Sequence, residues 1–99
     1  MKGYTARAMR AGLSKVGEPS SLRGVPCGNA VLNRSVNVAR MFPSTEADNY
    51  VGLYDVASIS TEFSPTRGDH FDHPDGAFVL DRLVHDNGAI RQYIVVTRV

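Results

Sequence analysis

The stretch 76–97, "GAFVLDRLVHDNGAIRQYIVVT", decides the fold, because it holds two apolar runs separated by Asn87-Gly88. Asn-Gly between such runs is the strongest short-range indication of a two-residue hairpin, since a type I′ turn needs positive φ at both central positions. We therefore predict a C-terminal hairpin over about 77–98. The turn sets a register with four cross-strand pairs: Phe78 with Thr97, Leu80 with Val95, Arg82 with Tyr93 and Val84 with Arg91.

Both faces of this hairpin are apolar, which a sheet with one face in water cannot hide. One face carries Leu80 and Val95, and the other carries Val79, Leu83, Ile90, Ile94 and Val96. One face can form the core, and the other needs a helix, a second sheet layer or another subunit. We expect a mainly β protein with a short N-terminal α-helix, folded as a small antiparallel β-sandwich or barrel-like domain.

The remaining chain supplies the other expected elements. Apolar residues at helical spacing predict a helix over about 4–16, with Gly17 as its C-cap. Residues 25–33 and 35–42 are predicted as two short strands separated by a turn, and 50–60 as a third strand. The polar segment 43–49 between them is predicted to be a mobile loop.

Length and charge limit the possible functions. A chain of 99 residues forms one domain, here 1–99, with one modest core. A net charge of +1 provides no field for capturing nucleic acid, so we expect no nucleic-acid specificity. No apolar run is long enough to span a membrane and the N-terminus lacks a signal-peptide pattern, so we expect no membrane contact and synthesis in the cytoplasm. Cys27 is the single cysteine, which excludes an internal disulfide and a Cys-rich zinc site.

The stretch 66–76, "TRGDHFDHPDG", contains three aspartates and two histidines and raises the question of a metal site. Its acids do not follow the spacing of an EF-hand loop. His70 and His73 would point to opposite faces of a strand and so cannot share a zinc ion. His73-Pro74-Asp75-Gly76 instead matches a turn that joins a short strand through Phe71 to the strand starting near Ala77. We expect no metal and no cofactor, and a metal-dependent enzyme is the weakest alternative.

Motifs of catalysis are missing from the sequence: it has no phosphate-binding glycine loop, no nucleophile elbow and no zinc-protease helix motif. Cys27, between Pro26 and Gly28, is interpreted as a small residue of a strand or turn rather than a nucleophile. Arg67-Gly68-Asp69 is interpreted as a solvated turn. The aromatic residues are interpreted as core and cross-strand pairs rather than a platform for stacking bases, and are Tyr50, Tyr54, Phe78 and Tyr93.

The last third of the chain resembles the head–tail joining (connector) proteins of long-tailed bacteriophages such as phage lambda. In that family an Arg-Gly-Asp or Gly-Asp turn precedes a short strand, a turn, a strand with an aromatic-Val-Asp-Arg-Val-like centre and a final hairpin strand. The corresponding residues here are Arg67, Gly68, Asp69, Gly76, Phe78, Val79, Asp81, Arg82 and Leu83. The segment "SSLRGVPCGNAVLNRSVNV" is similar to the first hairpin of the family. The resemblance extends over nearly the whole chain as a pattern, and its specific motif covers about the last 35 residues.

The resemblance implies a non-enzymatic virion protein. Such proteins assemble in the host bacterial cytoplasm as a ring, usually a hexamer, between the head-completion or portal ring and the tail terminator, and can be monomeric when free. We expect the contact surfaces to be Arg7, Arg10, the loop residues Pro43, Ser44, Thr45, Glu46, Asp48 and Asn49, and Arg67, Asp69, His70, Asp72, His73 and Asp75. Alternatives are a tail-terminator or other neck protein, and a small β-barrel module that binds RNA or peptide.

Overall fold

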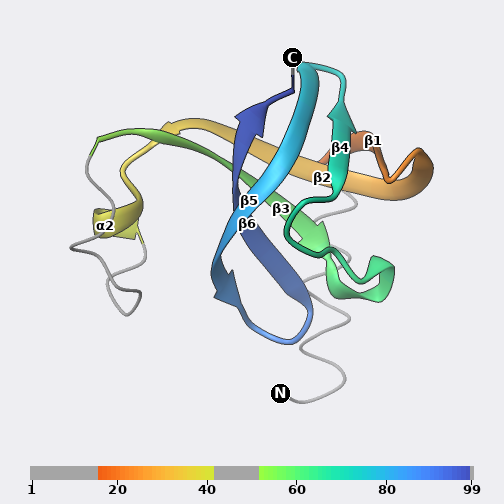
Figure 1. Ribbon diagram of the computed structural model, residues 1–99. Helices are drawn as coiled ribbons and strands as arrows, with labels where there is room; N and C mark the ends of the chain where they lie inside the picture. Colours follow the sequence, from red (N-terminus) through yellow and green to blue (C-terminus); the bar gives the residue numbers. More distant parts are fainter. Residues whose placement is uncertain (1–15, 42–51, 99) are drawn as a thin grey trace.

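Six strands form a closed barrel in the computed structural model, which describes residues 16–41 and 52–98 (Figure 1). All neighbouring strands are antiparallel, in the order β1-β2-β3-β6-β5-β4, and β4 pairs with β1 to close the ring. The elements are β1 (Glu18–Leu22), β2 (Val25–Val36), α2 (Val38–Met41), β3 (Tyr54–Ser60), the 3-10 turn η2 (Thr61–Phe63), β4 (His70–His73), β5 (Gly76–Asp86) and β6 (Ile90–Thr97). The mainly β, barrel-like fold predicted from the sequence is confirmed. The predicted helix over 4–16 lies outside the described residues, apart from Val16, whose side chain is exposed.

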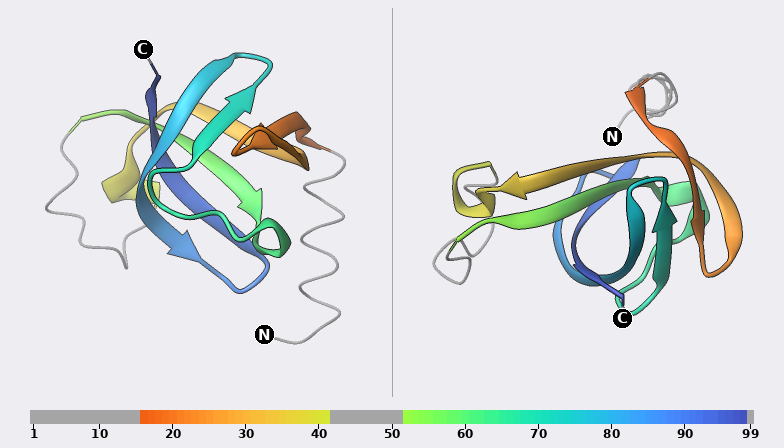
Figure 2. Two further views of the ribbon diagram at one scale, coloured as in Figure 1. Left: turned by 45° about the vertical axis from the view of Figure 1, so that its right-hand side comes forward. Right: turned by 90° about the horizontal axis from the view of Figure 1, so that it is seen from above.

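Every strand contributes side chains to the core inside the barrel. Figure 2 shows the closed outline of the barrel from above. Side chains fill this interior, as in other small barrels. Phe71 and Phe78 face each other across β4 and β5, with ring centroids 6.5 Å apart. Phe78 and Tyr93 are buried in this core, as predicted for the aromatic residues. The buried members are Leu22, Cys27, Ala30, Ala57, Ile59, Phe71, Phe78, Leu80, Tyr93 and Val95.

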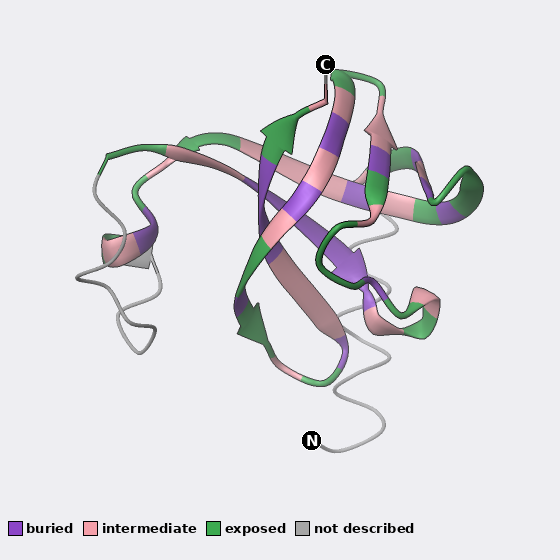
Figure 3. Cartoon of the chain, viewed as in Figure 1, coloured by how far each residue is buried: buried purple, intermediate pink, exposed green. Residues whose placement is uncertain are grey.

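A second, smaller core lies on the outer side of the barrel wall. Because side chains alternate along a strand, Ile94 points away from the interior that Tyr93 and Val95 fill. Ile94 packs there with Val38 of α2 and with two further buried valines, Val56 and Val84. β2 and β3 extend beside the barrel, with α2 at the end of β2 (Figure 1), and α2 has a buried part (Figure 3). Part of the hairpin's second apolar face is therefore covered by α2, a helix that the sequence did not predict.

The segment 25–42 differs from the prediction of two strands. β2 runs without a break to Val36, and Ser35, at φ +55°, forms a bulge rather than a turn. The chain then enters α2, where the side chain of Asn37 accepts the backbone N–H of Arg40 at 3.1 Å as an N-cap. Strand β1 was not predicted either. Its sequence, EPSSL, has little apolar character, and its pairing with β2 and β4 makes it a strand.

The C-terminal hairpin forms, but the predicted register is right only far from the turn. The pairs Phe78–Thr97 and Leu80–Val95 are observed. Two bulges in β5 then shift the register by two positions, so that Arg91 lies opposite Asp86 rather than Val84, and Arg82 lies opposite Ile94. The bulges place Val84 in the outer core, which an even register does not permit.

The loop of this hairpin is wider than a type I′ turn, so that prediction was wrong. Gly88 has positive φ, whereas Asn87 is not among the described residues with positive φ. The Asn87 side chain accepts the N–H groups of Ala89 and Ile90 at 3.0 and 2.9 Å, which stabilises a three-residue connection. A two-residue turn with positive φ at both positions occurs instead between β1 and β2, at Arg23-Gly24.

Asp86 makes the stability of this loop depend on pH. Its carboxylate accepts the N–H of Gly88 at 2.9 Å and pairs with Arg91, which hold the pKa of Asp86 below its usual value. The folded state therefore binds fewer protons than the unfolded state in acid, and this contribution to stability is lost as pH falls below about 4 through the folded pKa. We expect Asp86→Asn to be less stable than the wild type at neutral pH, with the difference shrinking in acid, as measured by urea unfolding from about pH 6 to pH 2. A difference that is constant across this range contradicts the assignment.

Candidate interaction cleft

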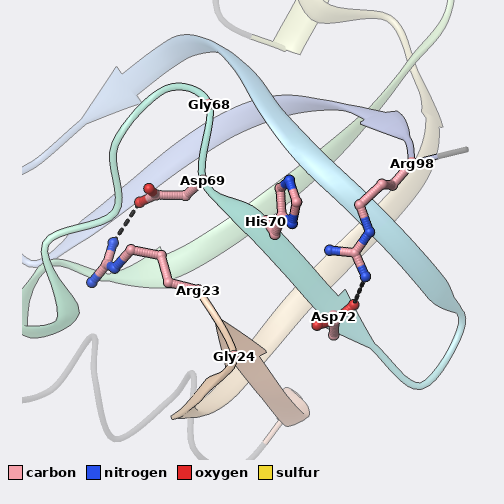
Figure 4. Close-up of a pocket in the computed structure, with 7 residues that line it drawn as sticks. All are labelled: Arg23, Gly24, Gly68, Asp69, His70, Asp72 and Arg98. Atoms are coloured by element: carbon pink, nitrogen blue, oxygen red, sulfur yellow. Dashed lines mark hydrogen bonds and ion pairs between the residues drawn. The ribbon is translucent and has the colours of Figure 1, made fainter.

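A hollow on the described part of the chain lies on the outer wall of the barrel beside β4. It has a volume of about 480 Å³ and is lined by Arg23, Gly24, Gly68, Asp69, His70, Asp72 and Arg98 (Figure 4). Since Phe71 points into the core, its neighbours His70 and Asp72 face outward. We call this hollow, with the seven residues that line it, the β4 cleft.

Arg23 and Asp69 form one end of the cleft (Figure 4). Arg23 donates to the Asp69 carboxylate and also to the carbonyl oxygens of Phe63 and Ser64, at 2.9 and 3.3 Å. Asp69 in addition accepts the backbone N–H of Thr66 at 2.9 Å, and its own N–H donates to the Thr66 carbonyl. Because each partner is held by several bonds, this end of the cleft is rigid.

Arg98 and Asp72 form the other end, with 2.7 Å between the Arg98 Nη2 and the Asp72 Oδ1. The backbone N–H of Arg98 donates to the carbonyl of Ala77, which continues the β5–β6 ladder by one residue past β6. The Arg98 side chain is 29% exposed, and among the described residues its guanidinium bonds only to Asp72. Arg98 therefore keeps further N–H donors available to a ligand.

His70 occupies the middle of the cleft, between the two arginine–aspartate pairs (Figure 4). Its ring makes no hydrogen bond or ion pair with another described residue. Across the sheet His70 lies opposite Val79, and Val79 lies opposite Val96, so the three side chains share the outer face. Val96 is 49% exposed, which gives the cleft an apolar margin.

The described residues contain no group of three or more His, Cys, Asp or Glu side chains able to hold a metal ion. Cys27 is buried in the core, and burial raises the pKa of its thiol, which disfavours the reactive thiolate. No helix of the described chain is both long enough and apolar enough to cross a membrane.

The structure brings together some of the predicted contact residues and separates others. Asp69, His70 and Asp72 line the cleft, with Asp69 mostly engaged in internal bonds. Arg67 is exposed beside it and pairs with Asp81 at 3.7 Å. The predicted turns are both observed: Arg67 and Gly68 occupy the turn closed by the Asp69 N–H, and Pro74-Asp75 joins β4 to β5.

His73 is placed differently from the other predicted contacts. Its side chain is only 4% exposed, and its Nδ1 accepts the N–H of Asp75 at 3.1 Å, so it stabilises the turn and offers little surface. Arg7, Arg10 and the residues of 43–49 lie outside the described residues. Sequence reasoning missed Arg23 and Arg98. The Arg23-Gly24 dipeptide, which forms a turn with positive φ at both residues, was the one local sequence pattern that could have drawn attention to Arg23.

Comparisons of the chain with family models, with curated proteins and with solved structures found no match.

Proposed function

We propose that the chain is a virion structural protein of a tailed phage or prophage, which joins the DNA-filled head to the tail through protein–protein contacts. In this proposal it acts without catalysis and assembles as a ring, a hexamer by analogy with the family it resembles. Its neighbours are the portal-associated head-completion ring and the tail terminator.

One observation carries the proposal: the two segments that resemble the family lie side by side in the barrel, because β1 pairs with β4. The Gly68-Asp69 turn is bonded to Arg23 of the first hairpin, which is the other segment that resembles the family. Gly76 starts β5, and Phe78 belongs to the core. Asp69 and Phe78 thus have structural roles, whereas Arg82 and Leu83 of the same pattern are exposed.

The surface chemistry is consistent with this role. The β4 cleft places charged residues near the exposed apolar side chain of Val96, and protein interfaces combine apolar and polar groups. Its charges balance, since Arg23 and Arg98 are each paired with an aspartate. A balanced surface suits recognition of a neighbouring protein by local contacts rather than attraction of DNA.

The proposal is tested by complementation of particles in vitro. Heads and tails are prepared from the phage or induced prophage that encodes the chain, with its gene disrupted, and the purified protein is added. We expect infectious particles to be restored by the wild type. We expect a drop of at least tenfold with Arg98→Glu, because a charge reversal at a contact costs more than about 1.4 kcal/mol.

Arg40→Glu serves as the matched control, since Arg40 is an exposed arginine on α2, outside the cleft. It should restore particles as the wild type does. A folded wild-type protein that binds neither heads nor tails and restores no infectivity refutes the proposal, and favours the alternative of a small peptide-binding module.

A further inference from the structure

We propose that the β4 cleft binds an acidic side chain of a neighbouring protein, with the carboxylate between Arg98 and His70 and the aliphatic stem against Val79 and Val96. The inference deepens the proposed function and rests on it only for the identity of the neighbour as a virion protein. The binding chemistry follows from the residues of the cleft.

The cleft has donors to spare but few acceptors. Arg98 uses one nitrogen for Asp72, and a guanidinium presents five N–H donors in a planar fork. His70 adds a ring nitrogen without a partner among the described residues. The acceptors of the lining, the carboxylates of Asp69 and Asp72, already receive an arginine. The donors of Arg98 that Asp72 does not use can receive a second carboxylate, which matches the planar fork of the guanidinium.

Other classes of ligand fit less well. Asp69 and Asp72 offset the charges of Arg23 and Arg98, so every negative charge on a ligand adds repulsion. A carboxylate brings one such charge, whereas a phosphate monoester or a nucleic acid brings more and is disfavoured further. A metal cation would have to displace an arginine from each carboxylate. A purely apolar segment would leave the donors of Arg98 and His70 without acceptors once the cleft is dry, which costs free energy.

The walls of the cleft allow a backbone to approach. Gly24 and Gly68 line it with positive φ, and a Cβ built on either residue would meet no atom within 4 Å. Val79 lies next to His70 in the cross-strand register, and Val96 lies on the far side of Val79, on the same outer face. The methylene groups of a glutamate or the flanking residues of a peptide can therefore cover Val96 while the carboxylate reaches Arg98.

The test is a titration of the ¹⁵N-labelled full chain with two peptides whose termini are blocked, acetyl-Ala-Val-Glu-Val-Ala-amide and its Gln analogue. Binding is monitored through changes in the amide chemical shifts of the protein. We expect saturable shifts confined to the cleft and its margin, with a dissociation constant of the order of millimolar for the Glu peptide and at least about tenfold weaker binding for the Gln peptide. Equal shifts with both peptides, shifts elsewhere on the barrel, or none up to about 10 mM overturn the inference.

Three variants locate the binding. Arg98→Gln and His70→Ala should each weaken binding of the Glu peptide, and His70→Ala does so without removing the Arg98–Asp72 pair. Arg40→Gln is the matched control, since Arg40 is an exposed arginine on α2, outside the cleft; it should bind as the wild type. If Arg98→Gln and His70→Ala bind as tightly as Arg40→Gln, the carboxylate is not in the cleft. Failure of particle complementation with intact Glu-peptide binding would refute the virion role and leave this binding chemistry standing.

Discussion

Replacing Phe71 with alanine is expected to lower the free energy of unfolding by about 3–5 kcal/mol, a large part of the 5–15 kcal/mol typical of a domain. The Phe71 ring is fully buried in the barrel core and contacts Phe78 from the neighbouring strand. Because strands on both sides of β4 are hydrogen bonded into a closed ring, the wall cannot collapse into the cavity that the substitution leaves. Urea unfolding followed by far-ultraviolet circular dichroism measures the loss, since the chain has no tryptophan.

Val25→Ala is the control for this prediction. Val25 is also a strand residue, but 63% of it is exposed, so its truncation should change the stability by no more than about 0.5 kcal/mol. A loss below about 1 kcal/mol for Phe71→Ala would mean that the barrel interior is not packed as described.

Replacing Val38 with aspartate is expected to open the outer core while the barrel stays folded. Val38 is fully buried there, and an aspartate in its place must keep its charge in contact with water. α2 has only four residues, so it can detach without breaking a strand pair. The loss of stability should therefore stop at about 1.5–3 kcal/mol, the contribution of burying one aliphatic side chain.

Hydrogen exchange distinguishes this local opening from global unfolding. Amides of 36–41 and 54–56 should exchange faster in Val38→Asp, whereas those of β4 and the facing part of β5 should keep their protection. Arg40→Asp, an exposed change on the same helix, should leave both regions unaffected. A uniform rise in exchange over all strands would show that the two cores unfold as one unit.

Only some residues of the candidate site could be predicted from the sequence. The concentration of Asp and His residues in 66–76 indicated the right segment, and His70 and Asp72 do line the cleft. Their partners come from elsewhere in the chain: Arg23 lies 46 residues from Asp69, and Arg98 lies 26 residues from Asp72. No spacing rule links such positions, because they meet only after β1 has paired with β4 and β5 with β6.

The sequence by itself determined the local features of this protein. Alternating apolar residues made the C-terminal hairpin, and His73-Pro74-Asp75-Gly76 made the turn between β4 and β5, because these structures depend on residues close together in the chain. Tertiary structure alone decided the closure of the barrel, the strand character of β1, the bulges of β5 and the two ion pairs of the cleft. These features depend on which distant strands pair. The pairing of distant strands is determined by burial of the core and by hydrogen bonding of every strand edge in the closed barrel. The local conformational preferences of the residues contain no information about either.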